Sequence, residues 1–97
     1  EETAGVVCLR PLDAEACEMK RLFVPVPHRR KGIAQALCST LLKTARDKGY
    51  KVMRLDTGCF MTESQALYRK LGFTYTSAYQ LVREELRDQL VFMELYL

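Results

Sequence analysis

A strand, a basic turn, an apolar-faced helix and a second strand follow one another between Cys17 and Thr57, and this order constrains the fold most. Two prolines, Pro25 and Pro27, end the first strand because proline cannot donate to a strand ladder. The helix is predicted over Ile33–Lys48, where apolar residues recur every four positions. Such a strand–helix–strand unit implies a right-handed crossover joining a parallel or splayed strand pair.

The first of these two strands, Cys17–Val24, does not keep a regular alternation of apolar side chains. Met19 lies in one phase, whereas Leu22 and Val24 lie in the other. An extra residue in the strand would bring both sets onto the same face. We therefore predict a β-bulge near Lys20-Arg21.

The remaining elements complete a small α/β fold. A capping box, T-x-x-Q from Thr62 to Gln65, predicts the start of a second helix that Gly72 closes. Further strands are expected over Gly5–Arg10, Tyr50–Thr57, Phe73–Tyr79 and Gln89–Leu97, the last two as an antiparallel pair. Residues 82–87 fit a helical turn or a loop equally well. The prediction is a mixed sheet of about five strands with two helices, in a single domain over residues 1–97.

The positive charge of the chain is concentrated in one place. Fifteen Lys and Arg residues against twelve Asp and Glu residues give a net charge of +3, and the cations at 28–31 supply the excess. A nucleic-acid surface would spread its cations along a face with interleaved aromatic residues, and this pattern is missing from the sequence. We therefore expect a small polyanionic ligand and no nucleic-acid partner.

The four cysteines show no spacing that suits a zinc site. They are Cys8, Cys17, Cys38 and Cys59. Since they lie in apolar segments, we expect buried free thiols, no bound metal, and a cytoplasmic location. No apolar run approaches the roughly 20 residues that span a bilayer, so no membrane partner is expected.

Three cations and a glycine precede the predicted first helix, in the run Arg29-Arg30-Lys31-Gly32-Ile33-Ala34. The N-terminus of a helix carries about half a positive charge, so cations there call for a compensating anion. Glycine allows the anion to approach the backbone N–H groups closely. A phosphate is the expected ligand, and a solvated basic turn is the alternative.

Four segments taken together resemble bacterial members of the GNAT superfamily of N-acetyltransferases. They are E-M-K-R-L-F-V-x-x-x-x-R-R-K-G-I-A, L-D-T-G, A-L-Y-R-K-L-G-F and F-M-E-L, in this order and spacing. The resemblance implies a splayed central strand pair and one acyl-CoA-binding domain. A usual member has a further strand and one or two helices before the position of Gly5, and these are absent from the sequence.

The resemblance also implies a site for acetyl-CoA as the co-substrate. Backbone groups of Leu22, Phe23 and Val24 would bind the pantetheine arm of the molecule. The turn amides would hold its pyrophosphate, in a site made by Arg29, Arg30, Lys31, Gly32, Ile33 and Ala34. A nucleoside triphosphate is not expected because the chain lacks G-K-[ST]. The asparagine that many members place before the second helix is replaced here by Thr62.

Two residues are implied as catalytic. Tyr68 would act as the general acid toward the departing CoA thiolate, and a packing or cofactor-binding role is the alternative. Glu18 would take the proton of the attacking amine. The alternative is a carboxylate that is solvated, or that forms a salt bridge with Lys20 or Arg21. An acyl-enzyme on Cys59 is not expected, because no activating base is assigned to it.

The expected function is transfer of an acetyl group to an unidentified small-molecule or peptide amine by direct attack in a ternary complex. The alternative is a non-catalytic module that binds acyl-CoA, and a third reading is a fragment of a longer enzyme. An exposed strand edge at the start of the chain also predicts a homodimer, through that edge or through the strand Val91–Leu97.

Overall fold

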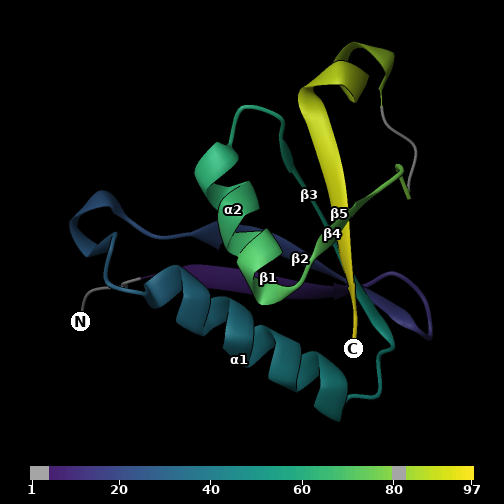
Figure 1. Ribbon diagram of the computed structural model, residues 1–97. Coiled ribbons are helices and arrows are strands. Elements are labelled where there is room, and N and C mark those ends of the chain that lie inside the picture. Colours follow the sequence, from purple (N-terminus) through teal and green to yellow (C-terminus); the bar gives the residue numbers. More distant parts are fainter. Residues whose placement is uncertain (1–4, 80–82) are drawn as a thin grey trace.

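The computed structural model describes residues 5–79 and 83–97, and Figure 1 shows one sheet with both helices on the same side. The sheet has the strand order β1-β2-β3-β5-β4. Its strands are β1 (Val6–Pro11), β2 (Ala16–Phe23), β3 (Val52–Gly58), β4 (Thr74–Thr76) and β5 (Leu90–Tyr96). The predicted α/β class, with five strands and a mixed sheet, is confirmed.

Two helices follow the central strands. Helix α1 (Ile33–Asp47) connects β2 to β3, and α2 (Thr62–Leu71) follows β3. Two short 3-10 turns, η1 (Val26–His28) and η2 (Glu84–Gln89), precede α1 and β5. Residues 82–87 were predicted to form a helical turn or a loop. Of these, 84–87 belong to η2, whereas Val82 lies outside the described residues.

The hydrophobic core lies between the helices and the face of the sheet that they cover. It is built from Cys17, Met19, Cys38, Leu42, Ala45, Met53, Leu55, Tyr68, Phe73 and Met93. Because side chains alternate along a strand, the neighbours of Cys17 and Met53 on β2 and β3 point to the opposite face. That second face carries the charged residues Glu18, Arg54 and Asp56.

The two central strands run parallel for only a short distance. Their register contains Ala16↔Val52, Cys17↔Met53 and Glu18↔Arg54, after which β1 is the one partner of β2 among the described strands. Strand β3, in contrast, pairs with β5 along its whole length. The splayed strand pair that the resemblance implied is therefore present, and it opens immediately after Glu18.

The irregularity predicted in β2 is also present. Cys8 of β1 pairs with Lys20, but Val6, two residues away, pairs with Phe23, three residues away. One extra residue therefore lies in β2 between Lys20 and Phe23. This bulge explains why the apolar side chains before and after it change phase.

Two local predictions were wrong. The N-cap of α2 is Met61, and no side chain caps this end, so the predicted capping box does not form. Gln65 is instead buried, and its amide donates to the carbonyl groups of Gly58 and Cys59 at 3.0 and 3.3 Å. The strand predicted over Phe73–Tyr79 is limited to β4, although its antiparallel pairing with β5 is confirmed.

The four cysteines are free thiols, but only Cys17 and Cys38 are buried. Cys8 and Cys59 are exposed, so the expectation of burial was wrong for these two. No helix within residues 5–79 and 83–97 combines the length and the apolar character needed to cross a membrane.

Candidate functional site

A groove of about 790 Å³ opens at the ends of β2 and β3, between the N-termini of the two helices. Eight of the nine residues predicted for acetyl-CoA binding line it: Leu22, Phe23, Val24, Arg29, Arg30, Gly32, Ile33 and Ala34. Lys31 is not among the lining residues. The structure thus brings the end of a strand and a basic turn together around one concave surface.

The opposite side of the groove was not predicted from the sequence. It comes from the loop after β3 and the first turns of α2, and it consists of Phe60, Met61, Thr62, Glu63, Ser64 and Leu67. The ring of Phe60 is 76% exposed and Met61 is 45% exposed. The signal was present in the sequence, because two large apolar residues directly before a polar helix start are unusual unless they contact something.

The turn before α1 leaves the helix N-terminus open. Gly32 is the N-cap residue with φ of +77°, and no side chain caps the helix. A Cβ at Gly32 would meet no atom within 4 Å, so the backbone conformation, and not crowding by the protein, requires glycine here. The first turn of α1 contains no acidic residue. Its free N–H groups are therefore suited to an anion.

Arg29 ties the basic turn to the end of β2. Its Nε donates to the carbonyl oxygen of Val24 at 2.8 Å, and its guanidinium lies 6.0 Å from the ring centroid of Phe23. Phe23 is itself 54% exposed. A ligand that paired with the Val24 carbonyl would have to displace this guanidinium.

Tyr68 lies in the core and not in the lining of the groove. It is 6% exposed, and its ring contacts Phe73 edge-on with a centroid distance of 5.9 Å. Burial, with a smaller contribution from the Cys38 thiol, raises the pKa of Tyr68 to about 12. The phenol is thus protonated at neutral pH, and it adjoins Leu67, which does line the groove.

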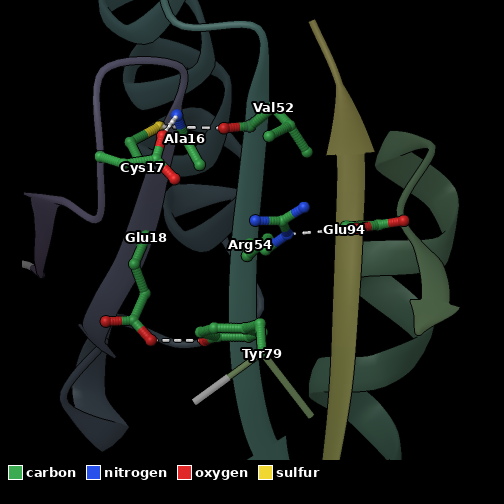
Figure 2. A network of polar contacts seen from close by, with 8 residues as sticks. Ala16, Cys17, Glu18, Val52, Arg54, Tyr79 and Glu94 are labelled. Atoms are coloured by element: carbon green, nitrogen blue, oxygen red, sulfur yellow. Dashed lines mark hydrogen bonds and ion pairs between the residues drawn. The ribbon is translucent and has the colours of Figure 1, made fainter. Parts of the chain in front are cut away.

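Glu18 lies on the other face of the sheet, at the point where β2 and β3 separate. Its side chain is fully buried, so the alternative of a solvated carboxylate is wrong. Oε1 forms ion pairs with Arg10 Nη2 at 3.0 Å and Lys20 Nζ at 3.6 Å. Oε2 accepts a hydrogen bond from the hydroxyl of Tyr79, as Figure 2 shows.

Two of these partners, Arg10 and Tyr79, were not anticipated. Arg10 is the residue of β1 that pairs in register with Glu18, so a predicted hairpin register could have identified it. Tyr79 is 61 residues away in the chain, and no pattern in the sequence links it to Glu18. Glu18 and Tyr68 themselves lie on opposite faces of the sheet.

No group of three His, Cys, Asp or Glu side chains within the described ranges is arranged to hold a metal ion. This finding covers only the part of the chain that the structure describes.

Comparison with known proteins relates this chain to one protein family. The family model for the GNAT acetyltransferases matches residues 1–73. Human N-acetyltransferase 8 is 43% identical over an alignment of 81 residues, and the match covers 78% of this chain and 36% of the human protein. The uncharacterized N-acetyltransferase YjgM of Escherichia coli is 32% identical over 71 residues, or 73% of this chain and 42% of that protein. The chain thus spans less than half the length of these relatives.

Solved structures agree with this assignment. A GNAT family acetyltransferase from Elizabethkingia anophelis, determined with acetyl-CoA bound, superposes with a TM-score of 0.85 at 25% identity. The match covers 99% of this chain and 70% of that one. An acyl-CoA N-acyltransferase from Klebsiella pneumoniae gives a TM-score of 0.86 at 27% identity, covering 96% of this chain and 63% of that one. The chain belongs to the GNAT acetyltransferase family.

Proposed function

We propose that the chain is an N-acetyltransferase domain that transfers an acetyl group from acetyl-CoA to an amine. The groove carries this proposal, because it joins an open helix N-terminus to the end of β2, which pairs with β1 but no longer with β3. Family membership and the acetyl-CoA bound by the Elizabethkingia relative support the same substrate. Residues 1–97 then act as a single acyl-CoA-binding domain.

In this proposal the two ends of the groove bind different parts of acetyl-CoA. The N–H groups from Arg30 to Ala34 bind the pyrophosphate, assisted by the positive end of α1. The backbone of Leu22, Phe23 and Val24, which lies beyond the last residue of β2 that pairs with β3, binds the pantetheine arm. Arg29 releases the Val24 carbonyl when the arm enters and becomes free to contact a phosphate.

The chemistry that we propose is direct attack of a neutral amine on the thioester. The nitrogen lone pair forms the N–C bond and the C–S bond breaks. The nitrogen loses one proton as the amide forms and the CoA thiolate takes one up, so the number of protons is unchanged. Positioning supplies most of the rate enhancement, because both substrates are held in one complex. Glu18 is the proposed base, and Tyr68, which remains protonated up to about pH 12, is the proposed acid.

Two measurements test the proposal. Titration calorimetry should show acetyl-CoA binding that weakens as salt increases, because charged groups hold the pyrophosphate. Release of the CoA thiol should then follow when amines of several classes are added: amino acids, peptides with a free N-terminus, polyamines and arylalkylamines. No binding at low salt would contradict the acetyl-CoA site itself.

Replacement of Tyr68 tests the proposed acid. Tyr68→Phe should lower kcat by about 10²- to 10⁴-fold, the usual effect of losing a positioned proton donor, with an unchanged dissociation constant for acetyl-CoA. Tyr96→Phe is the matched control, because Tyr96 is 69% exposed on the last strand. An unchanged kcat in Tyr68→Phe would leave Tyr68 with a packing role only.

The alternative is a domain that binds acyl-CoA without catalysis. Two observations favour it: Tyr68 does not line the groove, and Tyr79 occupies one oxygen of the Glu18 carboxylate. Binding of acetyl-CoA with no thiol release for any amine class would support this alternative over the transferase.

Compartment and assembly form a separate part of the proposal. The free thiols are the basis for proposing a reducing compartment, the cytoplasm. Among residues 5–79 and 83–97, β1 pairs with β2 alone, and on this basis we propose a homodimer through the outer edge of β1. Strand β5 lies between β3 and β4 and is a poorer choice. Sedimentation as a monomer at tens of micromolar would remove this assembly.

A further inference from the structure

Tyr79 spans the face of the sheet that the helices leave uncovered. Its ring packs edge-on against Phe92 of β5, with a centroid distance of 5.4 Å, and its hydroxyl donates to Glu18 of β2. Because β3 lies between β2 and β5, the side chain crosses over β3 at the point where the central strands separate. Figure 2 shows this crossing, with the hydroxyl directed at the carboxylate.

Charged side chains from four segments surround this hydroxyl and carboxylate. They are Arg10 on β1, Lys20 on β2, Arg54 and Asp56 on β3, and Glu94 on β5. Arg54 forms an ion pair with Glu94 at 3.2 Å. Arg10 and Lys20 contact Oε1 of Glu18, so the two oxygens of this carboxylate have different partners.

The Tyr79 hydroxyl remains protonated in this setting. Burial raises its pKa, and the hydrogen bond to Glu18 and the negative charges of Glu18 and Asp56 raise it further. The hydroxyl proton is donated to Oε2, and the phenolic oxygen keeps lone pairs that can accept a proton from another group. The hydroxyl can therefore accept one proton while it donates another.

The carboxylate of Glu18 is closed to direct contact with a substrate. Its exposed fraction is 0%, whereas Tyr79 is only partly buried. Of these two hydrogen-bonded residues only Tyr79 has exposed surface, so an amine at the opening between β2 and β3 would approach the pair from the tyrosine side. If the carboxylate acted directly, the hydrogen bond from Tyr79 would first have to break.

We propose that Tyr79 is a catalytic residue that relays a proton from the acceptor ammonium to Glu18. The inference rests on the proposed transferase function. In the relay, an N–H bond of the ammonium breaks as its proton bonds to the phenolic oxygen. The original hydroxyl proton of Tyr79 bonds to Oε2 of Glu18 in the same step. The products are a neutral amine, a carboxylic acid and an unchanged tyrosine, so protons and charge balance.

The test is the pH dependence of kcat/KM in the parent and in Tyr79→Phe, which retains the contact with Phe92 but lacks the hydroxyl. With a lysine-type amine, whose pKa is about 10.4, almost all acceptor is protonated at about pH 7. Tyr79→Phe should lose about 10²-fold or more in kcat/KM there, and much less at about pH 9.5, where free amine is plentiful. Tyr96→Phe, on the same face of the sheet, should follow the parent at both pH values.

A double-mutant cycle with Glu18→Gln identifies the pathway. If Tyr79 and Glu18 act in one relay, the double variant should be no slower than the slower single variant. A Tyr79→Phe defect that is equal at all pH values, or that multiplies with the defect of Glu18→Gln, would overturn the relay and leave a structural role. Unchanged kcat/KM in Tyr79→Phe would overturn it too.

The failure of the relay is distinguishable from failure of the proposed function. A parent protein that turns over amines while Tyr79→Phe behaves like the parent contradicts only the relay. A parent protein that binds acetyl-CoA but turns over no amine contradicts the transferase proposal, and the relay with it.

Discussion

The two ends of strand β2 offer opposite environments within a few residues. Around Glu18 the strand has a neighbour on each side, and the Glu18 side chain is fully buried. At Phe23, beyond the bulge, the strand has lost its pairing with β3 and the side chain is 54% exposed. The separation of β2 from β3 therefore gives one strand both an enclosed polar site and an open backbone edge.

Charged residues differ in the same way between the closed end of β2, around Glu18, and its open end, around Phe23 and the basic turn. At the closed end, Arg10 and Lys20 both form ion pairs with Glu18. At the open end, Arg29, Arg30 and Lys31 form no ion pair within the part of the chain that the structure describes. The closed end is electrostatically satisfied by the protein, whereas the open end is left for a ligand that brings negative charge.

The largest effect is expected from a negative charge placed at the open end. Gly32→Glu should weaken acetyl-CoA binding by more than about 100-fold in titration calorimetry. The carboxylate would occupy the place proposed for the pyrophosphate, and a residue with a Cβ also costs about 1–2 kcal/mol in a left-handed conformation.

Gly49→Glu is a closely matched control. Gly49 has φ of +87°, and a Cβ there would also meet no atom within 4 Å, but it lies at the other end of α1. The two variants should lose similar stability, while only Gly32→Glu should lose binding. Equal affinity in both variants would place the pyrophosphate elsewhere.

At the closed end the expected effect is on stability. Glu18→Ala should lower the free energy of unfolding by about 1–3 kcal/mol, because it removes the acceptor of the Tyr79 hydroxyl and one ion pair of Arg10. Asp47→Ala removes the exposed pair with Lys43 and should cost about 0.5 kcal/mol or less. Urea unfolding at neutral pH compares the two, and equal losses would show that burial of Glu18 adds nothing.

The open end could largely be predicted from the sequence, whereas the closed end could not. The open end is built from local patterns, a proline-ended strand, a basic turn and a helix start, and its lining residues were largely anticipated. The bulge was predictable because the phase of Met19 and Leu22 disagrees. The splay came only from the resemblance to the family.

The closed end depends on contacts that local patterns cannot contain. Tyr79 reaches Glu18 from 61 residues away, and it lies in the segment after β4, which ends at Thr76. The capping box failed for a similar reason. Gln65 donates to the carbonyls of Gly58 and Cys59, and Tyr75 donates to its Oε1, so tertiary partners outcompete the local one.

Alkaline pH should reveal how tightly the helix-covered side of the sheet is closed. Burial raises the pKa of the Cys17 and Cys38 thiols from 9.0 to about 11 and that of Tyr68 to about 12. The unfolded chain ionises these groups first, so their stabilising contribution is complete below about pH 9 and is lost between about pH 9 and 12.

The free energy of unfolding should therefore fall by about 1 kcal/mol for each of these thiols between about pH 8 and pH 10. Cys38→Ala should reduce this decline in urea unfolding, whereas Cys8→Ala, at an exposed thiol, should leave it unchanged. A decline of the same size in Cys38→Ala would show that the Cys38 thiol is not its source.

The smallest effect is expected on the α2 side of the groove. Glu63 lies in the first turn of α2 and lines the groove, so its carboxylate faces the region proposed for a phosphate-bearing ligand. Glu63→Gln removes this repulsion but also removes a favourable interaction with the helix N-terminus, worth about 0.3–1 kcal/mol to stability. Acetyl-CoA should bind about twofold more tightly while the protein becomes slightly less stable.

Since charge–charge interactions are largely screened beyond about 3 Å in 1 M salt, the gain in acetyl-CoA affinity should vanish there. Glu15→Gln, in the turn before β2, should change affinity at neither salt concentration. Weaker binding by Glu63→Gln would mean that this carboxylate contacts a donor group of the ligand. The open end would then bind its ligand through an acidic group as well as through cations.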